Sequence, residues 1–131
     1  MTDRETLVAV TKVDPGICGF PCVVTAKKEG SRTVSIEISG SECKQIQKLS
    51  EDLQEMSLRE LFKPITRNPV MVSAQSAGCH TSCTIPVAIL KTVEVAMEMA
   101  VAKDVKIEVS KNGNSPASCG ENGRRAGESK P

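Results

Sequence analysis

Residues 22–39 have the sequence CVVTAKKEGSRTVSIEIS, and this stretch decides the fold because it predicts a β-hairpin. In its second half, Val34, Ile36 and Ile38 alternate with polar residues, which is the pattern of a strand with one covered face and one face in water. Residues 22–28 predict the first strand of the pair, and residues 29–32 supply the turn between them.

The segments on either side of the hairpin supply a further strand and two helices. Residues 6–13 are rich in β-branched side chains, which favour a strand. A helix is expected over about residues 42–54, where apolar residues recur at helical spacing. Ser57 and Glu60 have the spacing of a capping box, which predicts a short helix that ends before Pro64.

The second half of the chain predicts one long helix followed by one more strand. Residues 68–74 fit either an extended or a helical segment, and residues 75–82 are expected to form a loop. Pro86 suits the first turn of a helix, which is the most hydrophobic in the chain and should run to residue 101 or 102. Residues 105–109 alternate between apolar and charged side chains and predict a fourth strand.

These elements predict an α+β fold with an antiparallel or mixed sheet of about four strands and helices packed on one face. We expect residues 1–109 to form a single domain, since a chain of this length buries a modest core without disulfides. Residues 110–131 are rich in Gly, Ser, Asn and charged residues and lack apolar periodicity. They predict a flexible tail.

Composition and charge exclude several classes of function. The formal net charge is +1, so a broad basic surface for nucleic acid is not expected. Phe20 and Phe62 are the only aromatic residues, which argues against stacking of bases on aromatic rings. No run of about 18 apolar residues suggests a membrane span, and the acidic N-terminus does not resemble a signal peptide. We expect a cytoplasmic protein that binds neither nucleic acid nor membrane, with an unknown protein partner and a homo-oligomer as one option.

The six cysteines are the most informative residues for function. The reducing cytoplasm disfavours structural disulfides, so metal binding and reactive thiols are the leading interpretations. Cys79 and Cys83 flank the only histidine, His80, just before the helix expected at Pro86. Their spacing differs from the Cys-x-x-Cys of zinc ribbons and ferredoxins, so the pattern indicates a metal without identifying it.

Helix ends connect this cluster with cysteines that are distant in sequence. Cys83 and Cys43 both lie near an expected helix N-terminus, where the helix dipole favours a thiolate. With Cys18, after the first strand, they are expected to converge at one end of the sheet, and Cys79 or His80 is a further ligand. The expected cofactor is zinc or an iron–sulfur cluster. Four sulfurs suit a closed site, whereas three sulfurs and an open position suit a catalytic or substrate-binding metal.

Several of these residues also have a purely structural interpretation. Cys43 lies on the apolar stripe of its helix, and free cysteine is among the most buried residue types. Cys22 falls on the apolar face of its strand and is favoured as a core residue rather than as a ligand. His80 is favoured slightly as an exposed loop histidine. Cys119 lies in the expected tail and is the cysteine least expected in a packed site.

Three short motifs carry a resemblance to a known group of proteins. They are GICGF at residues 16–20, Cys43 after a serine-rich strand end, and CTIP at residues 83–86 ahead of LKTVEVA at residues 90–96. Together they resemble a small uncharacterised family of prokaryotic, often archaeal, cysteine-containing domains, over about residues 6–109. The resemblance implies a cytoplasmic location and singles out the cysteine of each motif, but it implies no reaction.

The candidate functions belong to different classes. The first is a metal-binding protein with a zinc or iron–sulfur site formed by Cys18, Cys43 and Cys83, with Cys79 or His80 added. The second is a thiol redox enzyme in which Cys83 attacks as a thiolate and Cys79 resolves it as a disulfide. The order of Cys83, helix and strand is similar to the OsmC-like thiol peroxidases, although the arginine and glutamate partners of that family have no recognisable match. The third is a structural or adaptor domain whose cysteines are mostly core residues.

Overall fold

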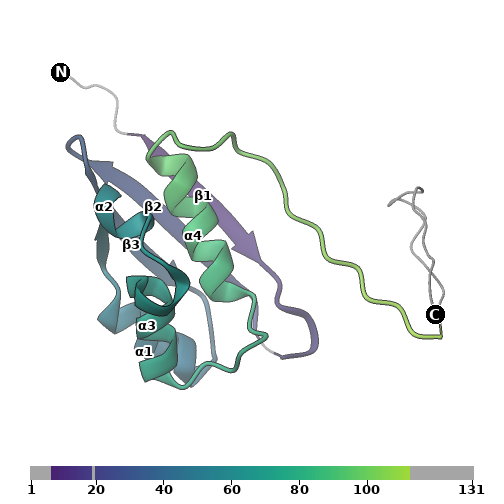
Figure 1. Cartoon of the computed structure of the whole chain (residues 1–131). Coiled ribbons are helices and arrows are strands. Elements are labelled where there is room, and N and C mark those ends of the chain that lie inside the picture. The colour runs from purple at the N-terminus through teal and green to yellow at the C-terminus, as the bar shows by residue number, and fades with distance from the viewer. Residues whose placement is uncertain (1–6, 19, 113–131) are drawn as a thin grey trace.

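A computed structural model describes residues 7–18 and 20–112 of the chain, and it has a layer of helices on one face of a sheet (Figure 1). The four strands form one antiparallel sheet in the order β1-β2-β3-β4. The predicted α+β class, with a four-stranded sheet and helices on one face, is confirmed. The elements in chain order are β1 (Val8–Val13), η1 (Gly16–Cys18), β2 (Cys22–Glu29), β3 (Thr33–Ser39), α1 (Lys44–Asp52), β4 (Glu55–Ser57), α2 (Leu58–Leu61), η2 (Ile65–Arg67), α3 (Pro69–Ala77) and α4 (Ile85–Ala96).

The hairpin of β2 and β3 provides the surface on which the helices pack. Its register pairs Val24 with Ile38 and Ala26 with Ile36, so the apolar residues of the two strands lie on the same face. Val24 and Ala26 are fully buried, and Ile36 and Ile38 are nearly so. The turn contains Gly30 at a φ of 79°, a left-handed conformation that glycine adopts without the steric cost of a Cβ. The predicted hairpin is therefore confirmed.

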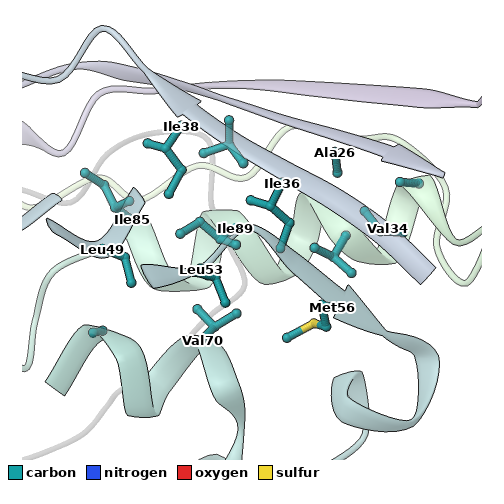
Figure 2. Packing of buried hydrophobic residues seen from close by; sticks show 14 of the residues in the cluster. Ala26, Val34, Ile36, Ile38, Leu49, Leu53, Met56, Val70, Ile85 and Ile89 are labelled. Carbon is teal, nitrogen blue, oxygen red and sulfur yellow. The ribbon is translucent and has the colours of Figure 1, made fainter. Parts of the chain in front are cut away.

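Helix α4 closes the core by packing across β1 and β2, while α1 and α3 pack together beside it over β3 (Figure 1). Ile89 and Val93 of α4 and Leu49 of α1 are fully buried. Figure 2 shows side chains of the hairpin and of the helices meeting in one interior. This core is built from aliphatic side chains with Cys22, Met56 and Met97, as the scarcity of aromatic residues requires.

The most hydrophobic helix is shorter than predicted. Helix α4 ends at Ala96 rather than at residue 101 or 102, and Glu98 has a φ of 63°, which an α-helix cannot accommodate. The carboxylate of Glu98 lies 3.1 Å from the ammonium group of Lys28 at the end of β2. The amide of Met99 donates to the carbonyl of Glu94. These bonds close the helix with a turn, although its sequence continues to be apolar.

The predicted strand over residues 105–109 is wrong as a member of this sheet. Residues 101–110 have no regular secondary structure, and Val105, Ile107 and Val109 are exposed. The fourth strand is instead β4, which pairs with β3 through Val34 and Met56. An alternating pattern identifies a segment that suits a sheet, but it does not identify the partner strand. The expected tail lies outside the described residues beyond residue 112, and so does Cys119.

Residues 68–74, for which the sequence fits either an extended or a helical segment, form the start of helix α3. Asn68 caps it by accepting a hydrogen bond from the amide of Val70 at 3.0 Å, Pro69 occupies the first turn, and Gly78 ends it at a φ of 86°. The predicted loop therefore begins after Ala77 and not at residue 75. The capping box of α2 is confirmed, because Ser57 and Glu60 each accept from the backbone amide of the other.

Helix length limits what the described chain can span. None of the helices in residues 7–18 and 20–112 is both long enough and apolar enough to cross a membrane.

Asn68 should be among the most important polar residues for stability. Its buried side chain caps α3 and also donates to the carbonyls of Glu60 and Leu61, both at 3.3 Å. Asn68→Ala removes these bonds and leaves buried backbone groups unpaired. We expect a loss of about 2–3 kcal/mol in the free energy of unfolding, measured by urea denaturation.

Thr84→Val is the matched control for this measurement. Thr84 precedes α4 without capping it, and its buried hydroxyl has no hydrogen-bond partner in the described part of the chain. Removing an unpaired buried hydroxyl should be neutral or slightly stabilising. Equal losses from Asn68→Ala and Thr84→Val would contradict the assignment of Asn68 as a structural cap.

Candidate functional site

Three cysteines from three different helix ends line one pocket at the end of the helical layer. Cys43 is the N-cap residue of α1, Cys79 follows the C-cap of α3, and Cys83 lies two residues before α4. The pocket has a volume of about 180 Å³, and His80 is also part of its wall. The remaining lining residues are Pro15, Phe20, Gln45, Ile46, Gly78 and Ile85.

The end of α3 positions Cys79. The left-handed Gly78 reverses the chain direction, and the amide of Cys79 then donates to the carbonyl of Ala74 at 3.0 Å. This is the six-to-one bond of a Schellman motif, which fixes the residue directly after the helix. A Cβ at Gly78 would meet Gln45 at 3.7 Å, an ordinary contact, so the positive φ rather than space favours glycine here. Cys79 is held half-buried beside the core.

The loop between α3 and α4 positions Cys83. The amide of Cys83 donates to the carbonyl of His80 at 3.1 Å, which folds residues 80–83 into a turn and brings Cys83 back toward Cys79. Helix α4 begins two residues later, with Pro86 in its first turn, as the sequence predicted. The backbone of the loop therefore holds two cysteines and the histidine at one mouth of the pocket.

Cys43 reaches the pocket from the start of α1. Its amide donates to the hydroxyl of Ser41 at 3.1 Å, and its thiol donates to the side-chain oxygen of Gln45 at 3.2 Å. The side chain is half-buried and packs against the core, so the structural interpretation of Cys43 is partly correct. Its sulfur nevertheless lines the pocket.

The thiols lie close enough to influence one another electrostatically. Burial raises the pKa of Cys79 above its ordinary value, and the negative charges that Cys83 and Cys43 carry when ionised raise it further. Burial also raises the pKa of Cys22, with a smaller contribution from Cys83. A positive charge in the pocket would oppose these effects and favour the thiolate form of Cys79.

Cys22 is a core residue, as its strand position favoured. It is 3% exposed and lies on the helix-facing side of β2, where it pairs with Val13 of β1. It does not line the pocket. The pKa of Cys22 responds to the charge of Cys83, but Cys22 is not part of the pocket wall.

The other two predicted ligands are His80, whose side chain the structure describes, and Cys18, for which it describes less. His80 is exposed, as the structural interpretation favoured, and also lines the pocket. For Cys18 the structure describes only the backbone, which ends η1. Among the described side chains, no three of the His, Cys, Asp and Glu residues are grouped closely enough to hold a metal ion without rearrangement.

Sequence reasoning missed two contributors to the pocket. Gln45 accepts the hydrogen bond of the Cys43 thiol, and its only sequence signal was a position two residues after that cysteine. Phe20 lies two residues before Cys22, a spacing that predicts a place on the same covered face of the strand, but it is 45% exposed and lines the pocket. A short loop before β2 places it there, and strand periodicity does not extend into such a loop.

The raised pKa of Cys22 predicts a loss of stability at alkaline pH. A thiol whose folded pKa exceeds its unfolded pKa contributes full stability below the unfolded value of about 8.5 and loses it as pH rises through the folded value. We expect the urea midpoint of the reduced protein to fall between about pH 8.5 and 10. Cys22→Ala should lower the midpoint at pH 7 but flatten this fall.

Val24→Ala is the control, because it also shrinks a buried side chain of β2 without removing a titratable group. The chain has no tyrosine, so thiols dominate its titration below about pH 10. An alkaline fall that is as steep in Cys22→Ala as in Val24→Ala would show that Cys22 does not cause it.

Comparison with known proteins gives a family but no activity. The model of a family of unknown function (DUF6951) matches residues 9–109. Searches of curated proteins and of solved structures found no significant match. The expectation of an uncharacterised family is confirmed, whereas its archaeal origin and its cysteine pattern stay predictions.

Proposed function

The chain belongs to that family of unknown function, so we propose a function from its own residues. We propose that cysteine thiolates of this protein bind either zinc or an iron–sulfur cluster. The observation that carries the proposal is the convergence of Cys43, Cys79 and Cys83 on one pocket from three separate helix ends. Thiolates are the ligands of zinc and of iron–sulfur clusters in proteins. The reducing cytoplasm that we expect would keep these thiols available.

The charge pattern of the pocket supports a cation rather than an isolated reactive thiol. Ionised Cys43 and Cys83 both oppose ionisation of Cys79. None of the lining residues that the structure describes is a lysine or an arginine that could offset this repulsion. A bound metal cation supplies the missing positive charge, and it releases the thiol protons as it binds.

The ligands must close around the metal, since the described side chains are not grouped tightly enough as they stand. A cysteine sulfur moves by rotation about a single bond, and a pocket of about 180 Å³ leaves room for that movement. The Cys43 thiol would exchange its hydrogen bond with Gln45 for the metal. Zinc–sulfur bonds of about 2.3 Å define how far the three sulfurs have to approach.

The fourth ligand decides what the metal can do. Cys18, whose backbone lies at the end of η1, would complete a closed four-sulfur site. His80, exposed at the pocket mouth, would instead complete a site with three sulfurs and one nitrogen. If neither binds, the open position would accept a water or a substrate, as in catalytic zinc sites.

Metal content of the anaerobically purified protein tests the proposal. We expect stoichiometric zinc, or iron with visible charge-transfer absorption, and a drop of at least about tenfold in metal affinity for Cys43→Ser, Cys79→Ser and Cys83→Ser. Cys22→Ala is the control that should keep its metal, because Cys22 does not line the pocket. Metal-free wild-type protein that also fails to bind added Zn²⁺ or reconstituted iron would rule the proposal out.

A thiol redox function is the second candidate, and the turn between His80 and Cys83 favours it. In this function the Cys83 thiolate attacks a peroxide, forms a sulfenic acid and releases the alcohol or water as the leaving group. The Cys79 thiol then condenses with it to a disulfide and releases water. A metal-free protein that consumes peroxide and forms a Cys79–Cys83 disulfide, identified by mass spectrometry, would favour this candidate over the metal site.

A further inference from the structure

We propose that two copies of this chain form a dimer in which residues 101–110 of each copy add as a strand to the outer edge of β1 of the other. The proposal concerns a different region from the cysteine pocket and does not depend on the proposed function. It rests on two complementary features of the described chain, an exposed segment with strand periodicity and a sheet edge without a partner.

The first feature is the exposed segment. Val105, Ile107 and Val109 alternate with polar residues and are 58%, 70% and 90% exposed. The side chains of Lys106 and Glu108 form an ion pair at 2.8 Å, which places both on one side of the backbone. The three apolar side chains therefore share the opposite side, as they would in a β-strand. Three large aliphatic side chains exposed on one face of a segment form an apolar patch, and such a patch often marks an interaction site.

The second feature is the free edge of the sheet. Strand β1 pairs only with β2 and forms one end of the strand order. The amide of Lys28 donates to the carbonyl of Leu7, so residue 7 directs its carbonyl toward β2 at a hydrogen-bonded position of the ladder. By the alternation of an antiparallel ladder, Val8, Val10 and Lys12 direct their backbone amides and carbonyls outward. Within the described chain no other segment bonds to them.

The two features match in chemistry. The outward groups of β1 need a strand that brings its own unpaired amides and carbonyls, which residues 101–110 offer because they form no ladder. Val8 and Val10 are 47% and 60% exposed on the open face of the sheet. The apolar side of the added segment would supply their cross-strand neighbours and cover them.

The turn after α4 favours pairing of residues 101–110 with β1 of a second copy over pairing with β1 of the same chain. Glu98 adopts its left-handed conformation there and is held by the ion pair with Lys28, while the amides of Glu98 and Met99 bond back to the helix. Figure 1 shows the following segment running clear of the body after this turn. A segment that is held away from its own β1 is available to a second molecule.

A second copy is also the occupant that satisfies both features at once. Each chain carries one donor segment and one acceptor edge, so a two-fold exchange pairs both segments and both edges and then stops. Each pairing involves the three amides and three carbonyls of Val8, Val10 and Lys12, and the dimer has two such pairings. This gives a number of hydrogen bonds similar to the roughly ten of a typical protein interface.

Sedimentation velocity of the full chain under a reducing agent tests the proposal, since reduction removes dimers linked by disulfides. We expect a dimer for the wild type. The double variant Val105→Lys and Ile107→Lys places charges on the apolar side of the segment, and we expect a rise of at least about 30-fold in the dissociation constant. Lys106→Ala with Glu108→Ala changes the opposite side and is the matched control that should dimerise like the wild type.

Hydrogen exchange identifies the surface that is used. In the wild-type dimer the amides of Val8, Val10 and Lys12 should be protected, and the lysine variant should lose this protection. A monomeric wild type would overturn the proposal, including one whose segment is protected by pairing with its own β1. So would a dimer that persists unchanged in the lysine variant, as expected of a dimer bridged by a metal at the cysteine pocket.

Discussion

Burial of the apolar face of the β2–β3 hairpin is the constraint on which the rest of the structure depends. Val24, Ala26 and Val34 have no exposed surface, and the hairpin is covered mainly by α4, which packs on β2, and by α1, which packs on β3. Burial of aliphatic surface is non-directional, so its strength alone would not fix where each helix ends. Local polar bonds do that, through the capping box of α2, Asn68 at α3 and the Glu98 turn after α4.

The cysteine pocket is a consequence of these helix ends. Helices α1, α3 and α4 lie in one layer beside the sheet (Figure 1). The start of α1 and the loop between α3 and α4 line the same pocket. Cys43, Cys79 and Cys83 lie at or beside those ends, so packing that serves the core also gathers three thiols. Burial raises the pKa of Cys79, and the ionised forms of Cys83 and Cys43 would raise it further. A bound cation would favour the thiolate form that burial and neighbouring thiolates disfavour, and this is why we propose a metal rather than a core role for these residues.

The two edge strands of the sheet, β4 and β1, differ in length and in how far their outer edges are covered. At one end β4 is only three residues long and leads directly into the capped helix α2. At the other end β1 presents six residues with an open backbone edge and apolar side chains. Natural sheets usually protect such an edge with charges, bulges or another segment. Residues 101–110 have the alternating pattern of a strand that could cover this edge. The family match extends to residue 109 and so includes nearly all of this segment.

The sequence by itself determined the hairpin, the capping box, the start of α4 and the core role of Cys22, because periodicity and helix caps depend on residues within a few positions of one another. It also identified the cysteines that deserve testing, but not the role of Gln45. Only the tertiary structure decided that β4, and not residues 105–109, is the fourth strand, and that α4 ends at Ala96. The helix ends already predicted that Cys43 and Cys83 converge, but only the tertiary structure decided which residues surround them, including Gln45 and Phe20. These outcomes depend on which distant segments pack together, and alternation or spacing along the chain carries no information about the partner.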